Sequence, residues 1–176
     1  MFLIEDDNFL QEVQKKQIDD LLYNMSFPMY FMDHGLDDDG KGMFVHAMLK
    51  RPEGETGQRY NSDYFNFFTS CFSMFCSKHD IKVNEILRSA VNCCYNNGYV
   101  GTDIHSDHEF EHKQFLLYLN DPEDKETPTI VYNKEETEIL KKIYPKKYKG
   151  ACFDGLPHTF NYPKKGLRWV AVFTFT

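Results

Sequence analysis

The chain has 176 residues, of which 41% are hydrophobic and 16% aromatic, and its formal net charge at pH 7 is −7. This length suits one domain with a buried core, and the composition excludes wholesale disorder. The acidic balance argues against a general binder of nucleic acid or of acidic membrane surfaces, which needs an excess of Lys and Arg. We therefore expect a single domain over residues 1–176.

Neither membrane insertion nor export is favoured by the sequence. No run approaches the ~20 apolar residues of a membrane-spanning helix, and the first seven residues are acidic where a signal peptide would be basic. The five cysteines are an odd number without CxxC pairs, which disfavours a disulfide framework and a zinc ribbon. We therefore expect reduced thiols and a cytoplasmic location.

Two segments are predicted to be helical. In residues 8–24, apolar side chains recur at mixed spacings of three and four, which is typical of an amphipathic helix. Residues 62–77 show the same spacing in a run of four phenylalanines, Phe65, Phe68, Phe72 and Phe75. This pattern predicts a helix whose aromatic face packs against a core.

Between the helices the sequence predicts a short strand over residues 43–49 with a loop on each side. The loop at 37–42 is acidic and contains Gly, and the loop at 51–58 combines Pro, two Gly and mixed charge. Loops of this kind are usually solvated and sometimes close over a site as lids. We expect the determinants of the substrate in these loops, at 37–42 and 51–60, and in the loop at 121–128.

From residue 86 onward the sequence changes to short β-favouring runs separated by turn signals such as Asn96-Asn97-Gly98. The predicted strands are 86–95, 115–119, 129–132, 150–153 and 168–175. Two helical segments followed by many short strands predict an α+β chain that is mainly β, built as a sandwich or barrel.

A group of potential metal ligands lies within this β-rich part. His105 and Asp107 are two residues apart, so on an extended segment both side chains point to the same face. His158 follows 53 residues later, after a strand and a turn, and Arg168 begins the last predicted strand. Two imidazoles and one carboxylate can hold Fe(II) on one side and leave positions open for a chelating co-substrate and O₂. A buried guanidinium could bind a carboxylate through two parallel hydrogen bonds.

In the order and spacing of these residues the chain resembles the Fe(II)/2-oxoglutarate-dependent dioxygenases, in particular the prolyl-4-hydroxylase type and its small bacterial and phage relatives. The resemblance covers most of the chain and rests on FPMYF, RSAVNCCY, HSD, FLLYLND, TPTIVYN, ACFDGLPHTF and GLRWVAVFTF. It implies a double-stranded β-helix (jelly-roll) core with supporting N-terminal helices. The turn DKETPT at 124–129 departs from the Gly-rich turn usual in the family.

The resemblance also implies roles for individual residues. The iron ligands of the family correspond to His105, Asp107 and His158. The basic residue that pairs with the distant carboxylate of 2-oxoglutarate corresponds to Arg168, and Tyr118 in the YLN segment is expected to share that carboxylate. Two further residues, on the predicted strand before His105, are candidates for lining the co-substrate pocket: Asn92 and Tyr95.

The implied reaction is hydroxylation of an unactivated C–H bond, coupled to decarboxylation of 2-oxoglutarate to succinate and CO₂. It requires Fe(II), 2-oxoglutarate and O₂, with ascorbate as an optional reductant. A protein or peptide side chain such as proline is the first choice of substrate. Two alternatives stay open: the same chemistry on a nucleobase or small metabolite, and a jelly-roll binding module without catalysis.

Two other features have alternative interpretations. His108 and His112 give the segment HSDHEFEH the look of a zinc-binding tract, although the segment contains no cysteine and its flanks do not predict a helix. Lysines and tyrosines alternate between residues 141 and 149, which could form a nucleic-acid patch. We favour a solvated basic face that balances an acidic chain.

Overall fold

The computed structural model describes residues 2–23, 27–33, 41–53 and 57–176, and these residues form ten strands and two helices. In chain order the elements are β1 (Leu3–Asp6), α1 (Glu12–Tyr23), β2 (Tyr30–Met32), β3 (Met43–Leu49), α2 (Tyr64–Lys78), β4 (Ile86–Cys94), β5 (Lys113–Tyr118), β6 (Thr129–Tyr132), β7 (Ile139–Ile143), β8 (Gly150–Asp154), β9 (His158–Phe160) and β10 (Arg168–Phe175).

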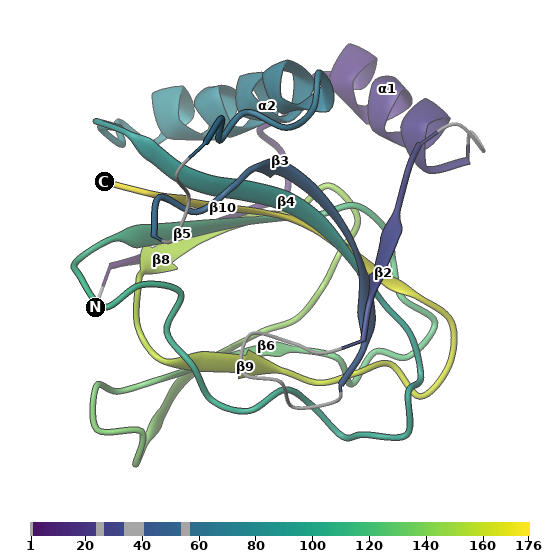
Figure 1. Ribbon diagram of the computed structural model, residues 1–176, viewed down its shortest axis with the longest axis vertical. Coiled ribbons are helices and arrows are strands. Elements are labelled where there is room, and N and C mark those ends of the chain that lie inside the picture. The colour runs from purple at the N-terminus through teal and green to yellow at the C-terminus, as the bar shows by residue number, and fades with distance from the viewer. Residues whose placement is uncertain (1, 24–26, 34–40, 54–56) are drawn as a thin grey trace.

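The strands form two antiparallel sheets that face each other. The larger sheet has the order β1-β8-β5-β10-β4-β3-β2 and the smaller sheet the order β7-β6-β9. In Figure 1 the smaller sheet lies below the larger one, and both helices lie on the outer face of the larger sheet. Neighbours in the sheets are distant in sequence, as when β10 pairs with both β4 and β5. This is the predicted mainly β, jelly-roll architecture with supporting N-terminal helices.

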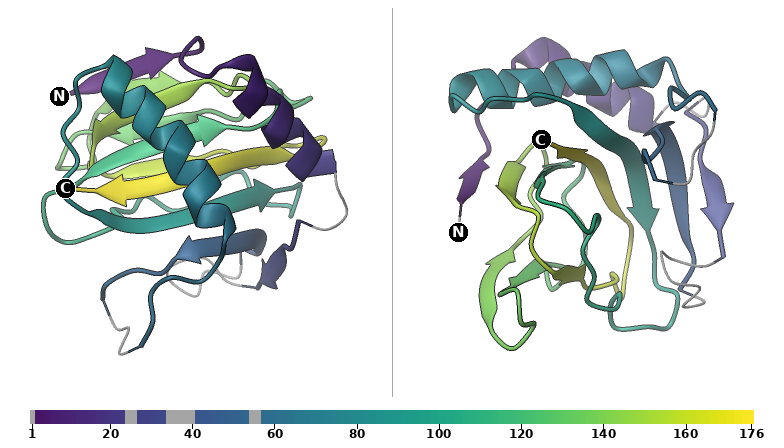
Figure 2. Two further views of the ribbon diagram at one scale, coloured as in Figure 1. Left: turned by 90° about the horizontal axis from the view of Figure 1, so that it is seen from above. Right: turned by 60° about the vertical axis from the view of Figure 1, so that its left-hand side comes forward.

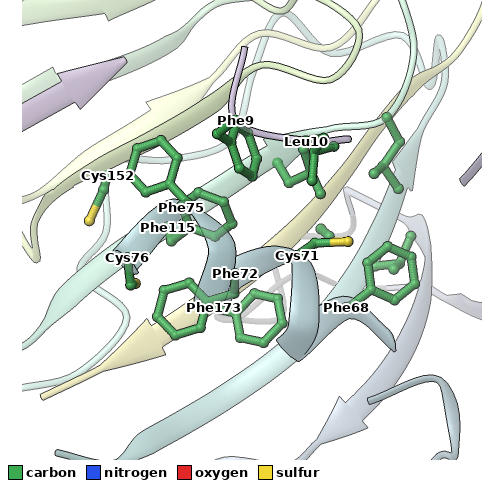
Figure 3. Close-up of a cluster of buried hydrophobic side chains, with 14 of the residues drawn as sticks. Phe9, Leu10, Phe68, Cys71, Phe72, Phe75, Cys76, Phe115, Cys152 and Phe173 are labelled. Carbon is green, nitrogen blue, oxygen red and sulfur yellow. The ribbon is translucent and has the colours of Figure 1, made fainter. Parts of the chain in front are cut away.

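Helix α2 crosses the strands of the larger sheet and covers their outer face (Figure 2). Its buried side chains follow the i, i+3, i+4, i+7 pattern of one helix face: Phe68, Cys71, Phe72, Phe75 and Cys76. They meet outward-pointing residues of the sheet, and the Phe72 ring stacks on Phe173 with centroids 4.9 Å apart (Figure 3). This helix–sheet layer is the larger apolar core of the protein.

The inner face of the larger sheet builds a second core between the two sheets. Successive side chains of a strand point to opposite faces, so Phe115 and Leu117 of β5 pack under the helices, whereas Leu116 and Tyr118 point into the roll. Val170 and Val172 of β10 join this inner cluster. The alternation separates an outer face that holds the helices from an inner face that is free to build a site.

The observed boundaries agree best with the predictions where the sequence pattern is local. Strands β3, β6 and β10 coincide with the predicted runs, and α2 begins two residues after its predicted start. Helix α1 begins only at Glu12, because Phe9 and Leu10 belong to the helix–sheet core instead. The Phe9 ring meets Phe75 edge-on with centroids 5.1 Å apart. The strands β1, β2, β7 and β9 were not predicted from the sequence.

The lysines between residues 141 and 149 are largely paired with acidic residues from the N-terminal segment. Lys141 and Lys149 both contact Glu5, each at 2.9 Å. Lys146 contacts Asp7, and Lys147 Nζ lies 2.8 Å from Asp19 Oδ1. These ion pairs compensate most of the positive charge of the cluster and fasten the N-terminal elements to the β7–β8 region.

Neither helix in the described ranges combines the length and the apolar character that crossing a bilayer requires.

Candidate active site

A cavity of about 110 Å³ lies inside the roll, between the two sheets. Its walls come from both sheets and from the segment between β4 and β5. Five of the seven predicted site residues line it: Asn92, His105, Asp107, His158 and Arg168. The other two do not: the side chain of Tyr118 lies behind Arg168, and the ring of Tyr95 packs 5.8 Å from that of Phe44.

His105 and His158 are brought together by a short antiparallel bridge. The His105 amide donates to the His158 carbonyl at 3.0 Å and the reverse bond is 2.9 Å, which places the ring centroids 4.6 Å apart. Each ring donates from Nδ1 to a backbone carbonyl two residues earlier, that of Asp103 or of Leu156, both at 2.9 Å. Because a carbonyl only accepts, the proton sits on Nδ1 and the Nε2 lone pair of both rings is available to a metal ion.

Burial keeps His158 neutral. It lowers the pKa of His158 to about 4, although the nearby Asp107 carboxylate opposes this shift. A neutral imidazole is the form that binds metal.

The Asp107 carboxylate is buried and strongly held. Its Oδ1 accepts a hydrogen bond from Arg51 Nη2 at 2.5 Å and lies 3.5 Å from Arg88 Nη1. Arg51 Nη1 also donates to the backbone carbonyl of Asp107. Its Oδ2 accepts from Gln114 Nε2 at 2.6 Å and lies 3.7 Å from His158 Nε2. Burial alone would raise the pKa of Asp107, but Arg88 and the other surrounding cations hold it well below its usual range.

These three side chains fit the facial arrangement that holds Fe(II): two imidazole Nε2 atoms with free lone pairs and one ionised carboxylate. Oδ2 is the oxygen nearer the histidines, because Oδ1 faces the arginines. Among the described residues, no three His, Cys, Asp or Glu side chains already stand close enough to hold a metal ion. The assignment of His105, Asp107 and His158 as iron ligands therefore stays a prediction.

Arg168 is a buried guanidinium at the other end of the cavity. It is 2% exposed and donates from Nε to the Thr127 carbonyl at 3.3 Å and from Nη2 to Thr129 Oγ1 at 2.8 Å. The ring of Phe160 lies 4.7 Å from its guanidinium carbon. Within the described ranges no carboxylate forms an ion pair with it. Because a buried unpaired charge is costly, this position suits an anionic ligand.

Tyr118 and Asn92 surround the same region in different ways. The Tyr118 hydroxyl lies 3.0 Å from Thr129 Oγ1, and its ring stands 5.4 Å from the Arg168 guanidinium carbon. Tyr118 thus supports Arg168 and Thr129 from behind. Asn92 lines the cavity, and its Oδ1 is buried with no hydrogen-bond partner among the described residues, so it could accept a hydrogen bond from a ligand.

Sequence reasoning missed several polar residues of the cavity and its surroundings. Arg88, Gln114 and Thr129 lie in or next to predicted strands, at positions that alternate with buried apolar residues, so period-two alternation could have indicated that they face inward. Arg51 has no such signal, because it follows β3 in a loop and reaches Asp107 across 56 residues. Of the two loops proposed as lids, 37–40 and 54–56 lie outside the described residues.

His108 and His112 form their own contacts next to the candidate site. His108 bonds Glu53 through Nδ1 at 2.6 Å and Thr174 through Nε2 at 2.8 Å. The His112 ring meets that of His108 edge-on at 4.8 Å and bonds the Phe110 carbonyl through Nδ1. The two rings therefore pack against each other and are held by Glu53, Thr174 and the Phe110 carbonyl.

No protein-family model matches the sequence, and a search of curated proteins also finds no match. Solved structures do match. A 2OG-Fe(II) oxygenase family oxidoreductase from Burkholderia pseudomallei has a TM-score of 0.75 at 12% identity, covering 99% of this chain and 84% of its own. A prolyl hydroxylase from Trichoplax adhaerens, solved with a hypoxia-inducible-factor peptide, has a TM-score of 0.66 at 17% identity, covering 98% and 83%.

A third similar structure is a non-heme alpha-ketoglutarate-dependent epimerase of nogalamycin biosynthesis, with a TM-score of 0.66 at 11% identity, covering 99% of this chain and 77% of its own. The chain thus has the fold of the 2OG-Fe(II) oxygenases, and the resemblance seen in the sequence is confirmed at the level of the fold.

Proposed function

We propose that this chain is an Fe(II)- and 2-oxoglutarate-dependent dioxygenase that hydroxylates an unactivated C–H bond. One observation carries the proposal. The same cavity is lined by two histidines and one carboxylate, His105, His158 and Asp107, and by the buried guanidinium of Arg168, which has no carboxylate partner among the described residues. The fold supports this function, since solved structures with it are 2OG-Fe(II) oxygenases.

In this proposal each residue has a defined task. His105 and His158 present Nε2, and Asp107 presents Oδ2, to the metal ion; Arg51 and Gln114 fix the orientation of the carboxylate. Arg168, together with Thr129, binds the distant carboxylate of 2-oxoglutarate. When bound, iron and 2-oxoglutarate supply the oxidising chemistry, with release of succinate and CO₂. The apolar wall of Val170 and Val172 keeps bulk water away.

We propose a protein or peptide side chain such as proline as the substrate, because a prolyl hydroxylase shares the fold. A small molecule is the second candidate, because the epimerase of nogalamycin biosynthesis shares the fold too. A cytoplasmic location is consistent with five cysteines that are all buried and unpaired.

The test is substrate-independent formation of succinate from 2-oxoglutarate. We expect His105→Ala and Asp107→Ala to abolish it, because each removes one of three metal ligands, whereas His79→Gln, which alters a histidine paired with Asp6 far from the cavity, should keep the wild-type rate. Anaerobic titration with Fe(II) and 2-oxoglutarate should give a weak charge-transfer band in the wild type and in His79→Gln, but in neither alanine variant. Unchanged turnover in both alanine variants would show that the iron assignment is wrong.

A further inference from the structure

Arg88 is a second cation of the cavity that the proposed reaction does not use. It lies on the inner face of β4, and its side chain is 18% exposed. Its Nη1 atom lies 3.5 Å from Asp107 Oδ1, which is the long limit of a hydrogen bond. Like the candidate metal ligands, it lines the cavity. A substrate bound beside the metal ion would therefore contact the Arg88 guanidinium.

Three acidic groups at or near the cavity are engaged by other residues. Arg51 contacts the same Asp107 oxygen at 2.5 Å, a full ångström closer than Arg88. Glu53 accepts a hydrogen bond from His108 Nδ1 at 2.6 Å, and Asp103 pairs with Lys41 at 2.6 Å. Among the described residues, the carboxylate that pairs with Arg88 is that of Asp107, and Arg88 shares it with the closer Arg51.

Counted over the described residues, the formal charges around the cavity sum to one excess positive charge. A divalent metal ion and dianionic 2-oxoglutarate cancel each other. Asp107 and Glu53 offset two of the three arginines, Arg51, Arg88 and Arg168, while Lys41 and Asp103 form a neutral pair. A partly buried cation with excess charge is unfavourable unless an anion joins it. One further carboxylate would make the loaded site neutral.

Arg88 and Arg168 face different parts of the cavity. In the ladder between β4 and β10, Arg88 pairs with Thr174 and Arg168 pairs with Cys94. The two positions are six residues apart along the strands, which corresponds to about 20 Å between their Cα atoms. Arg88 approaches Asp107, whereas Arg168 contacts Thr127 and Thr129. Each arginine is therefore placed to bind a different carboxylate.

We propose that the substrate carries a carboxylate and that Arg88 binds it next to the candidate metal ligands. The inference rests on the proposed function, because it assigns the substrate class of that same site. The carboxylate has two sources, the α-carboxylate of a free amino acid or an acidic side chain beside the modified residue of a peptide. Both present the planar pair of oxygens that a guanidinium binds with two hydrogen bonds.

The test compares each acid with its uncharged amide, without turnover. Binding is measured by calorimetry to the full chain loaded with Mn(II) and 2-oxoglutarate under anaerobic conditions. One pair of probes is L-proline and L-prolinamide; the other is the blocked peptides Ac-Pro-Glu-NH₂ and Ac-Pro-Gln-NH₂. We expect one acid to bind at least about tenfold more tightly than its amide, and the pair concerned identifies the source of the carboxylate.

Variants of Arg88 assign that preference to one side chain. Arg88→Gln should remove the acid-over-amide preference and leave the affinity for 2-oxoglutarate within about twofold, whereas Arg88→Lys should keep part of the preference because it retains the charge. Lys142→Gln, an exposed lysine of β7, serves as the control and should behave as the wild type. Thermal unfolding of each variant checks that the fold is kept.

Three results would overturn the proposal: no acid preference in either pair, an equal preference in Arg88→Gln, or an Arg88→Gln effect confined to 2-oxoglutarate binding. The last result would make Arg88 part of the co-substrate site. Failure of the wild type to bind 2-oxoglutarate would contradict the proposed function instead. In that case the comparison of acid with amide is made on the metal-free protein, where Arg88 alone is tested.

Discussion

Arg168 shows most clearly how a single side chain indicates function. Its guanidinium is among the largest fully buried groups of the chain and is held by a carbonyl, a hydroxyl and the faces of two aromatic rings. None of these partners carries a negative charge. A buried cation in such surroundings lowers stability unless an anion binds it, which is why we propose that Arg168 binds a carboxylate.

Variants of Arg168 and Tyr118 test this site. Arg168→Lys should weaken 2-oxoglutarate binding by about 10- to 100-fold, because an ammonium group cannot donate two parallel hydrogen bonds to a carboxylate. Tyr118→Phe should weaken it less, by about tenfold at most, because it removes only the hydroxyl that supports Thr129. Calorimetry with Mn(II)-loaded protein measures both. Wild-type affinity in Arg168→Lys would show that the co-substrate binds elsewhere.

At the scale of elements, strand β1 and helix α1 depend on partners far away in the sequence. β1 pairs with β8, and Glu5 of β1 contacts both Lys141 and Lys149. Burial alone would raise the pKa of Glu5, but hydrogen bonds from Lys149 and Lys141 outweigh burial and lower it. A lowered carboxyl pKa stabilises the folded state above the ordinary Glu pKa, and this contribution is lost as the pH falls through the folded-state value.

Glu5→Gln tests the contribution of this ion-pair group. We expect the free energy of unfolding at pH 7 to fall by about 1 kcal/mol. The difference from the wild type should shrink as the pH falls below the ordinary Glu pKa and disappear below the lowered folded-state pKa, where the wild-type carboxyl is also protonated. Urea unfolding across this pH range measures it. Glu12→Gln is the matched control, because the Glu12 side chain is 89% exposed and should contribute little. A pH-independent loss in Glu5→Gln would point to packing instead of charge.

At the scale of the whole molecule, two cores share the larger sheet. The helix–sheet core lies on its outer face and contains Cys71, Cys76 and Cys152, whereas the inner core surrounds the cavity. Aromatic rings from α2, β5 and β10 interlock in the outer core, as with Phe72 between Phe115 and Phe173. Because this core contains no cavity residue, it can carry the stability of the fold while the inner face carries the polar groups of the site.

The rate at which the cysteine thiols react with a thiol reagent measures how tightly the helix–sheet core is packed. Burial raises the pKa of Cys71 to about 11 and that of Cys76 to about 12, and it also raises the pKa of the other three thiols. At pH 8 we expect less than about one equivalent to react rapidly with Ellman's reagent in the folded protein, and all five after unfolding in guanidinium.

The same measurement in Phe72→Ala serves as the comparison. This truncation should lower the free energy of unfolding by about 3–5 kcal/mol. The thiols should then react faster with the reagent, because the outer core opens more often. Rapid labelling of several thiols in the native wild type would contradict the packing of the outer core.

Features whose signal lies within a short stretch of chain could be predicted from the amino-acid sequence. The phenylalanine spacing predicts α2, and the alternation in residues 168–175 predicts β10, because helical and extended backbones place neighbouring side chains on fixed faces. The family resemblance, which includes the order of His105, Asp107, His158 and Arg168, predicted the jelly roll and named seven candidate residues, five of which line one cavity.

The groups that surround those residues depend instead on how distant segments of the chain pack together. Arg51 and Arg88 reach Asp107 from two separate parts of the chain, and Tyr95 turns toward Phe44, away from the cavity. The segment β1 is a strand because it pairs with β8 at the edge of the larger sheet. Phe9 lies outside helix α1 because its ring packs on Phe75 in the outer core. Such contacts depend on strand order and on packing between distant segments, which local periodicity does not encode.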